Sequence, residues 1–238
     1  MKLVEDLIES AGGGEVPILR AAVGLHWTAV ESRTAGMSHT YKTHRKVELS
    51  GSGSLEGLGA LETSSRLRDW EPLEASLGLA SLNSLIEPRG EPGSVNGAIL
   101  EAIPGRSVAV IGRFPFNGRV ASGAGEAFFF ETEPTGDELP PFAVEEVLPR
   151  VDVAVITATA LINKSLPRLL ELSRDAWSVV LGPSTPMNDV LLDHGADLLG
   201  GIRVVRPDAL FSSVMQGVKK FGKIGGIEPI MLGRRFTR

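Results

Sequence analysis

Hydrophobic positions follow two different patterns along this chain, and the change from one to the other falls near residue 100. In the first part, apolar residues repeat at helical spacing in several segments, and β-rich segments lie between them. In the second part, short and nearly unbroken apolar runs alternate with helical segments. Unbroken apolar runs are typical of strands that are buried on both faces. The chain therefore predicts an α/β fold with two domains, residues 1–100 and 101–238.

The first part predicts an α+β domain. Leu3, Leu7 and Ile8 lie on one face of a helix over Met1–Ser10, which three glycines then end. The other elements expected here are a strand at Leu19–Val30, a short strand at Val47–Ser50, and helices at Leu55–Arg68 and Glu71–Ile86, the last with Pro72 in its first turn. The segment Glu87–Pro104, rich in proline and glycine, is expected to link the two domains.

The second part predicts a Rossmann-like domain with a parallel sheet, because strand-like runs alternate with helical segments. The expected strands are Ser107–Ile111, Glu126–Glu131, Val151–Thr157, Ser178–Leu181, a segment within Asp197–Val205, and a last strand at Ile227–Leu232. The expected helices are Ser165–Arg174, Met187–His194 and Asp208–Gly217.

Composition and charge exclude several classes of protein. The chain has 42% hydrophobic residues, enough for a core, and its net charge of −5 argues against broad capture of nucleic acid or of an anionic membrane. It contains no cysteine, which excludes disulfides, thiolate metal sites and iron–sulfur clusters. Its longest apolar stretch, Val151–Ile162, is far shorter than the ~20 residues that span a bilayer. We expect a cytoplasmic protein without a membrane or nucleic-acid partner.

Four strand ends of the predicted sheet carry unusual residues, and ligands of open parallel sheets bind beyond the carboxyl ends of the strands. The candidate ligand-binding residues at these ends are Gly112 and Phe114; Thr157, Thr159 and Asn163; Gly182, Ser184, Thr185 and Pro186; and Gly200 and Gly201. Hydroxyl and amide groups suit a neutral polar ligand or an oxyanion, and glycines allow close approach of the backbone. Each end also has a structural interpretation, as a strand terminus, a helix cap or a bulge.

The segment 182–187 is the strongest of the four candidates. Thr185 is expected to cap the helix that follows, with Pro186 at the first helical position. Free backbone N–H groups and the helix dipole would then favour an anion at this junction, and Ser184 would add a hydroxyl.

A nucleotide ligand is a second interpretation of the same sheet edge. Glu131 ends the second strand of the domain, 19 residues beyond Gly112, near the spacing at which Rossmann-type sites place an acid on ribose hydroxyls. Glu133 is a nearby alternative. The segment Gly112–Gly118 lacks the G-x-G-x-x-G fingerprint, which disfavours a dinucleotide held in the usual way.

The sequence contains no established metal-binding signature. Its four histidines are His26, His39, His44 and His194, and neither H-E-x-x-H nor a cysteine pair occurs. His39 and His44 are weak candidates for metal ligands, because only a loop could bring side chains at this spacing together.

Six stretches in order along most of the chain resemble one prokaryotic family. They are Val23–Ser32, Glu74–Ser84, Val108–Phe116, Asp152–Asn163, Leu181–Met187 and Gly195–Gly201. Members of this family combine a domain similar to the enolase N-terminal domain with a Rossmann-like domain known as the putative heavy-metal chelation domain. The resemblance implies a ligand site between the domains and a link to metal handling or metal-cofactor metabolism. The second domain also resembles S-adenosylmethionine-dependent methyltransferases.

Three functions are compatible with these features. The first is a metal-handling protein that binds a metal ion, a metal chelate or an oxyanion in the cleft between the domains. The second is an enzyme with an adenosyl ligand such as S-adenosylmethionine, in which Glu131 contacts the ribose. The third is a non-catalytic sensor of a small ligand. No residue stands out as a general base or a nucleophile.

Two weaker expectations concern association. Domains of this kind often self-associate, so we expect a homodimer. The C-terminal segment Gly217–Arg238 is basic, and we interpret it as a solvated or intersubunit face.

Overall fold

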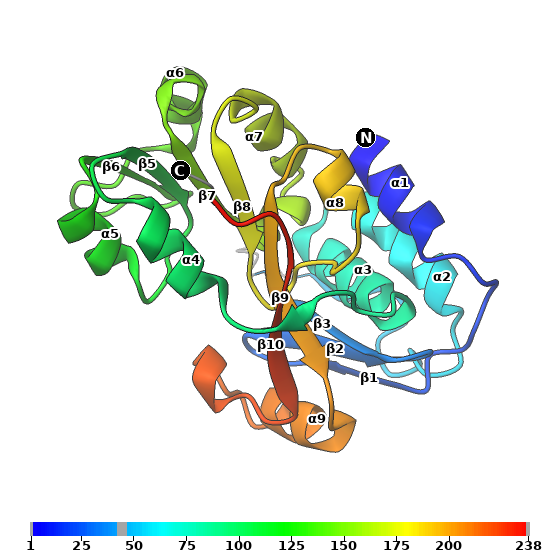
Figure 1. Cartoon of the computed structure of the whole chain (residues 1–238). Helices are drawn as coiled ribbons and strands as arrows, with labels where there is room; N and C mark the ends of the chain where they lie inside the picture. The colour runs from blue at the N-terminus through cyan, green and yellow to red at the C-terminus, as the bar shows by residue number, and fades with distance from the viewer. Residues whose placement is uncertain (1, 42–46, 237–238) are drawn as a thin grey trace.

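The computed structural model describes residues 2–41 and 47–236, which form two β-sheets with helices packed around them (Figure 1). The smaller sheet is antiparallel with the order β1-β2-β3, and these strands are Arg20–Val23, Trp27–Glu31 and Ala35–His39. The larger sheet has the order β4-β10-β9-β8-β7-β5-β6. Its strands are β4 (Glu91–Pro92), β5 (Ser107–Ile111), β6 (Glu126–Phe130), β7 (Val153–Thr157), β8 (Trp177–Leu181), β9 (Leu198–Val204) and β10 (Ile227–Gly233).

The helices of the described residues connect these strands and cover the sheets. They are α1 (Lys2–Ser10), α2 (Ala60–Ser64), α3 (Pro72–Leu85), α4 (Val95–Ala102), α5 (Asn117–Gly123), α6 (Val144–Val147), α7 (Leu166–Leu172), α8 (Val190–Asp193) and α9 (Pro207–Met215). Among the described residues, no helix has the length and apolar character needed to cross a membrane.

The larger sheet is Rossmann-like. Strands β6, β5, β7, β8 and β9 are parallel neighbours in that order, and β10 and β4 extend the sheet in the antiparallel sense. Numbered along the chain, the parallel strands have the order 2-1-3-4-5 of one class of doubly wound sheets. The direction of winding reverses between β5 and β7, which is where such sheets open a crevice for a ligand.

The two parts of the chain share a hydrophobic core. Val108 and Val110 of β5 pack under α4 and α5, whereas Ala109 faces the opposite side of the sheet. The core on that opposite side, under α7 and α8, is continuous with the core around Leu7 of α1 and Leu77 of α3. Helix α1 accordingly lies beside α8 (Figure 1). The division into residues 1–100 and 101–238 stays a prediction.

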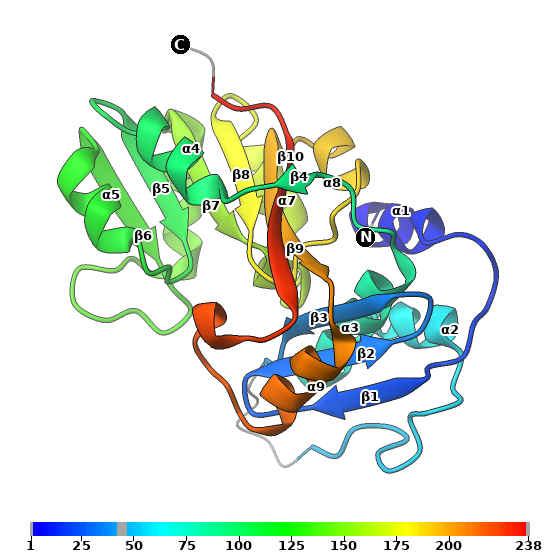
Figure 2. The same cartoon turned by 60° about the horizontal axis from the view of Figure 1, so that its bottom comes forward.

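The smaller sheet is packed between helices from both parts of the chain. Helix α3 contacts β2 and β3, and α9 contacts β1 and β2 on the other side (Figure 2). Ala29 of β2 and Met37 of β3 are buried against Phe211 of α9. This arrangement fixes the smaller sheet relative to the carboxyl ends of the parallel strands, because α9 follows directly on β9.

Every strand expected in the second part is confirmed to within two residues, and Ser107–Ile111 is confirmed without change. The helix expected at Glu71–Ile86 is confirmed as α3, with Pro72 at its start. Helices α5 and α6 were not predicted. The expected linker Glu87–Pro104 is wrong as a description of structure, because it contains β4, which pairs with β10, and helix α4.

Three expectations for the first part are wrong. The segment Leu19–Val30 is a hairpin of β1 and β2, because the chain turns at Gly24, whose N–H donates to the carbonyl of Trp27 at 2.9 Å. Residues 47–50 form no strand, and the third strand is β3. The helix expected at Leu55–Arg68 is reduced to α2 and a 3-10 turn, because the carboxylate of Glu15 accepts the N–H groups of Leu61 and Glu62 and so fixes where α2 begins.

Strand β3 packs directly on helix α3 at Gly36. A Cβ added at Gly36 would lie 2.3 Å from Ser84 N and 2.6 Å from Ala80 O, so the strand or the helix would have to move. We expect Gly36→Ala to lower the free energy of unfolding by about 1–3 kcal/mol, as overpacking does elsewhere. Urea denaturation measures this change.

Gly97→Ala is the matched control, because nothing lies within 4 Å of the Cβ position of Gly97 in helix α4. We expect it to raise the free energy of unfolding by about 0.5–1 kcal/mol through the lower entropy of the unfolded chain. Equal stabilities of the two variants would contradict the packing described for β3.

Candidate functional site

A cleft of about 830 Å³ lies along the carboxyl ends of β5, β6, β7 and β8 and beside Gly200 and Gly201 in the middle of β9. One wall comes from the strand-end loops of the larger sheet, and His26, Trp27, His39 and Tyr41 of the first part face them. Figure 2 shows the parallel strands running toward the smaller sheet and toward the segment after α9. The volume lies within the range of small-molecule sites.

The structure brings nearly all the predicted ligand residues to this one cleft. Those that line it are Gly112, Phe114, Glu131, Thr157, Thr159, Asn163, Gly182, Ser184, Gly200 and Gly201. Thr185 and Pro186 do not line it. The residues that line the cleft come together because parallel strands present their carboxyl ends at the same edge of the sheet.

The loop after β5 is held by side-chain hydrogen bonds and approaches β7 closely. Gly112 has a φ of +110°, and a Cβ there would lie 3.0 Å from the Cβ of Thr157, so glycine suits both the backbone and the contact. The side chain of Asn117 braces the loop, because its amide donates to Gly112 O at 3.3 Å and its oxygen accepts the N–H of Phe114 at 3.2 Å. The rings of Phe114 and Phe116 are stacked with their centroids 5.2 Å apart.

The loop after β7 leaves donor protons available. The hydroxyl oxygens of Thr157 and Thr159 are 2.9 Å apart, so one hydroxyl donates to the other and one proton of the pair is left. The side-chain oxygen of Asn163 accepts the N–H and the hydroxyl of Ser165 at 3.1 and 2.6 Å. The amide NH₂ of Asn163 has no protein acceptor among the described residues.

Ser184 joins the loop after β8 to the smaller sheet. Its side-chain oxygen accepts the backbone N–H of His39 at 2.8 Å, and its carbonyl accepts the side-chain amide of Asn83 at 3.1 Å. The residue is 1% exposed and lines the cleft. Within residues 2–41 and 47–236, its hydroxyl proton has no acceptor, so an acceptor can come from the cleft.

The helix cap expected at Thr185, with Pro186 at the first helical position, is wrong. Helix α8 covers only Val190–Asp193, so Thr185 is not its cap and Pro186 is not its first residue. The hydroxyl of Thr185 donates to the carbonyls of Gly182 and Gly200 at 2.8 and 2.9 Å, and its N–H donates to Gly182 O. Thr185 therefore closes the loop against β9, with its polar atoms already used.

The two glycines of β9 make room for neighbouring side chains. A Cβ on Gly200 would lie 2.6 Å from Val95, and one on Gly201 would lie 2.5 Å from the sulfur of Met187. Both glycines pair regularly with β10, so the bulge considered for this position is absent.

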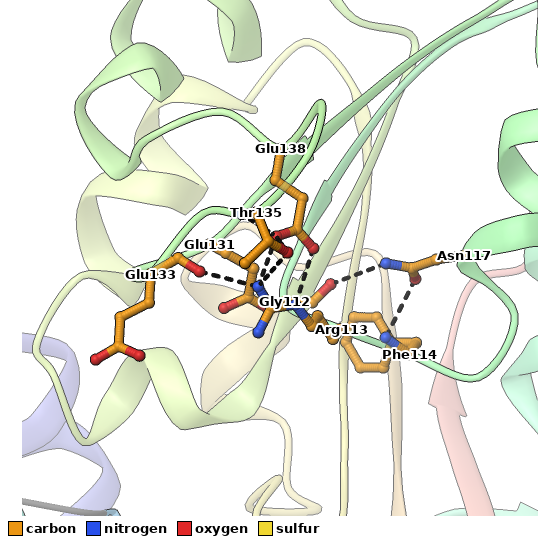
Figure 3. A network of polar contacts seen from close by, with 8 residues as sticks. All are labelled: Gly112, Arg113, Phe114, Asn117, Glu131, Glu133, Thr135 and Glu138. Atoms are coloured by element: carbon orange, nitrogen blue, oxygen red, sulfur yellow. Dashed lines mark hydrogen bonds and ion pairs between the residues drawn. The ribbon is translucent and has the colours of Figure 1, made fainter.

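An ion-pair network holds the segment after β6 against the loop after β5 (Figure 3). Arg113 donates from Nε and Nη2 to the two carboxylate oxygens of Glu138, at 2.8 and 2.6 Å, and from Nη2 to the carbonyl of Glu133 at 2.9 Å. Glu138 also accepts the N–H and the hydroxyl of Thr135 at 2.8 and 3.0 Å. These contacts lower the pKa of Glu138 to about 2, chiefly through Arg113.

Glu131 lies beside this network but makes no hydrogen bond to Arg113. Its Oε1 is 3.9 Å from Nε of Arg113, and its side chain is 17% exposed. Burial raises the pKa of Glu131 above its ordinary value, and the attraction of Arg113 offsets this only in part. The predicted acid at the end of the second strand is therefore a poorly solvated carboxyl group in the cleft.

Two family models match the chain over most of its length. Residues 97–224 match the DUF364 family, described as "Putative heavy-metal chelation", and residues 4–86 match DUF4213, which has the same description. The chain belongs to the DUF364 family. No curated protein matches the chain significantly.

Two solved DUF364 structures, both of proteins with unknown function, share this fold. The protein from Desulfitobacterium hafniense DCB-2 is 23% identical, with a TM-score of 0.85 over 98% of this chain and 97% of that one. The protein from Pyrococcus horikoshii is 20% identical, with a TM-score of 0.79 over 97% of this chain and 98% of that one.

A bare heavy-metal ion does not fit the described part of this DUF364 protein. Within residues 2–41 and 47–236, no group of three or more His, Cys, Asp or Glu side chains could hold a metal ion. His39 lines the cleft, whereas the other weak metal candidate, His44, lies outside the described residues. His194 pairs with Asp6 at 2.7 Å between α8 and α1.

The sequence analysis did not predict that residues of the first part of the chain and of the segment after α9 line the cleft. Trp27 and His39 are cross-strand partners, with ring centroids 5.5 Å apart, and a hairpin assignment for this region could have placed them on one face. Lys219 and Lys220 line the cleft although we interpreted their basic segment as a solvated face. The basic residues of this segment were visible in the sequence, but the sequence did not show that the fold places them at the cleft.

The pKa of Glu138 predicts an acid-dependent contribution to stability. A carboxyl group with a pKa lowered to about 2 stabilises the fold above its ordinary pKa near 4.5 and loses that effect as the pH falls toward 2. The difference in free energy of unfolding between wild type and Glu138→Gln should therefore shrink between about pH 5 and pH 2.5. Denaturant unfolding at several pH values measures it.

Asp137→Asn controls for the loss of one negative charge in the same segment. The free energy of unfolding of Glu138→Gln should change with pH differently from that of the wild type and of Asp137→Asn. The same pH dependence in all three proteins would contradict the proposed role of the Arg113 contact.

Proposed function

We propose that this protein handles a metal in anionic form, as an oxyanion or as an anionic chelate, and binds it in the cleft at the carboxyl ends of the parallel strands. The observation that carries this proposal is the set of donor protons at the strand ends that have no acceptor within residues 2–41 and 47–236. The family description supports the link to a metal, and the absence of a three-ligand cluster in the described residues argues against a bare ion.

The donors come from adjacent loops of the sheet. The hydroxyl of Ser184, one hydroxyl of the Thr157–Thr159 pair and the amide of Asn163 all line the cleft. A buried donor without an acceptor costs about 1–3 kcal/mol, so a ligand oxygen that accepts these protons is favoured. Oxyanions carry several such oxygens and no donors.

The charge at the cleft supports the same ligand class. Lys219 and Lys220 are exposed and line the cleft, and neither has an ion-pair partner in the part of the chain that the structure describes. Two ammonium groups that line the same cleft as the donors raise its affinity for an anion.

The size of the cleft and its apolar lining residues favour an anionic metal chelate over a bare oxyanion as the ligand. The cleft measures about 830 Å³ and includes Phe114, Phe116, Phe130 and Ile230 among its lining residues. This volume is far larger than a single oxyanion needs, and apolar walls of this kind bind the organic part of a ligand.

Calorimetric titration with molybdate, tungstate, Ni²⁺ alone and the Ni²⁺–citrate complex tests the proposal. We expect binding of the oxyanions or the citrate complex and none of Ni²⁺ alone. Ser184→Ala should weaken that binding about tenfold or more, because it removes a hydrogen bond to the anion and also the acceptor of the His39 N–H. Tight binding of Ni²⁺ alone, with no response to the anions, would contradict the proposal.

Thr185→Val is the matched control for Ser184→Ala. Its hydroxyl donates only to backbone carbonyls, so the substitution should lower the free energy of unfolding by about 1–3 kcal/mol and leave the affinity for the anion unchanged.

An enzyme with an adenosyl ligand is the second candidate function, and the position of Glu131 favours it. Glu131 directly follows β6, the neighbour of β5 in the 2-1-3-4-5 order, and lines the cleft. Glu131→Gln should then weaken the binding of S-adenosylmethionine or adenosine by roughly tenfold or more. Equal affinities of wild type and variant in the same titration would exclude a role of Glu131 in holding a ribose.

Other expectations stay predictions. A non-catalytic sensor would use the same cleft, and no specific contact favours it over the first two functions. The homodimer and the likeness of the first part to the enolase N-terminal domain are also untested.

A further inference from the structure

Glu131 is the acidic side chain among the described residues that line the cleft. The other polar side chains used for the proposed function are hydrogen-bond donors and lysines. A carboxyl group in the same cleft therefore suggests that the ligand also carries a donor or a positive charge. Nε of Arg113 lies 3.9 Å from Oε1 of Glu131, which is beyond hydrogen-bond distance.

Arg113 is kept from Glu131 by a competing carboxylate. Glu138 accepts hydrogen bonds from Nε and Nη2 of Arg113, which is the two-point geometry that guanidinium and carboxylate groups prefer. Thr135 then fixes Glu138 through two further hydrogen bonds (Figure 3). Without Glu138, the same edge of Arg113 would be available to Glu131.

We propose that the ligand of this cleft is bipolar, with a cationic or hydrogen-bond-donating group that binds Glu131 in addition to its oxyanion, and that Glu138 is a positioning residue that keeps Arg113 from neutralising Glu131. This inference rests on the proposed function, because it assumes an oxyanion at the donors of the other strand ends.

The topology gives the approximate separation of the two groups. Glu131 follows β6, the Thr157–Thr159 pair follows β7, and β5 lies between these strands. Neighbouring strands are about 4.8 Å apart, so the donor group and the oxyanion of the ligand are separated by about 10 Å. An extended chain of five carbons between an amine and a phosphate approaches this length.

The positioning role is tested first without a ligand, by an NMR titration of the ¹³C-labelled carboxyl of Glu131. In Glu138→Gln, Arg113 should move to Glu131 and lower its pKa. The loss of the Glu138 charge also lowers this pKa, so the double variant Arg113→Gln/Glu138→Gln separates the two causes. Arg113→Gln should raise the pKa of Glu131 more in the Glu138→Gln background than in the wild-type background; equal rises would overturn the positioning role.

The ligand class is tested with 5-aminopentyl phosphate and pentyl phosphate, which differ only in the ammonium group. Wild type should bind 5-aminopentyl phosphate about tenfold more tightly than pentyl phosphate, as expected for one charge-assisted hydrogen bond. Glu131→Gln and Glu138→Gln should lose this preference and keep their affinity for pentyl phosphate. Asp137→Asn, which removes a carboxylate outside the network, should retain the preference.

The outcomes separate this inference from the proposed function. Equal binding of both phosphates by wild type would overturn the bipolar ligand and leave the oxyanion site standing. A full preference in Glu138→Gln would overturn the positioning role of Glu138. Failure of wild type to bind either phosphate, molybdate or tungstate would overturn both. Thermal melts of each variant show that the comparison is made on folded protein.

Discussion

The contact between the smaller sheet and the loop after β8 is the interaction on which the candidate site depends. Ser184 accepts the backbone N–H of His39 and the side-chain amide of Asn83, so a single buried residue holds β3 and α3 at the carboxyl ends of the parallel strands. Neither part of the chain forms the cleft alone, because the strand-end loops and the aromatic residues around His39 face each other across it. The continuous core under α1, α3 and α8 keeps this arrangement in place.

The polar groups of the cleft are distributed unequally, and this distribution limits what can bind. Hydroxyl and amide donors lie at the ends of β7 and β8, and lysines lie in the segment after α9. At the β6 side, Glu131 is kept apart from Arg113 by Glu138. A bare cation would meet mainly donors, whereas a ligand with an oxyanion at one end and a donor at the other would satisfy both sides. The proposed ligand class gives the family description a specific chemical form that can be tested.

The sequence predicts the larger sheet well because unbroken apolar runs such as Ser107–Ile111 leave few alternatives. It predicts the cleft residues for a related reason, since parallel topology alone places the strand ends together. The smaller sheet was predicted poorly. Gly24 turns an apolar run into a hairpin, and β3 consists mostly of small and polar residues, of which Gly36 packs directly against α3. The role of Thr185 depended on tertiary contacts with β9, and local capping preferences could not reveal them.

A crystal soaked in tungstate, with anomalous data collected at the tungsten edge, tests the central claim most directly. The account predicts an anomalous peak in the cleft, with tungstate oxygens within about 3.2 Å of the hydroxyl of Ser184 and of one hydroxyl of the Thr157–Thr159 pair. A cleft without tungsten, combined with a nickel peak on cleft side chains in a parallel Ni²⁺ soak, would contradict it.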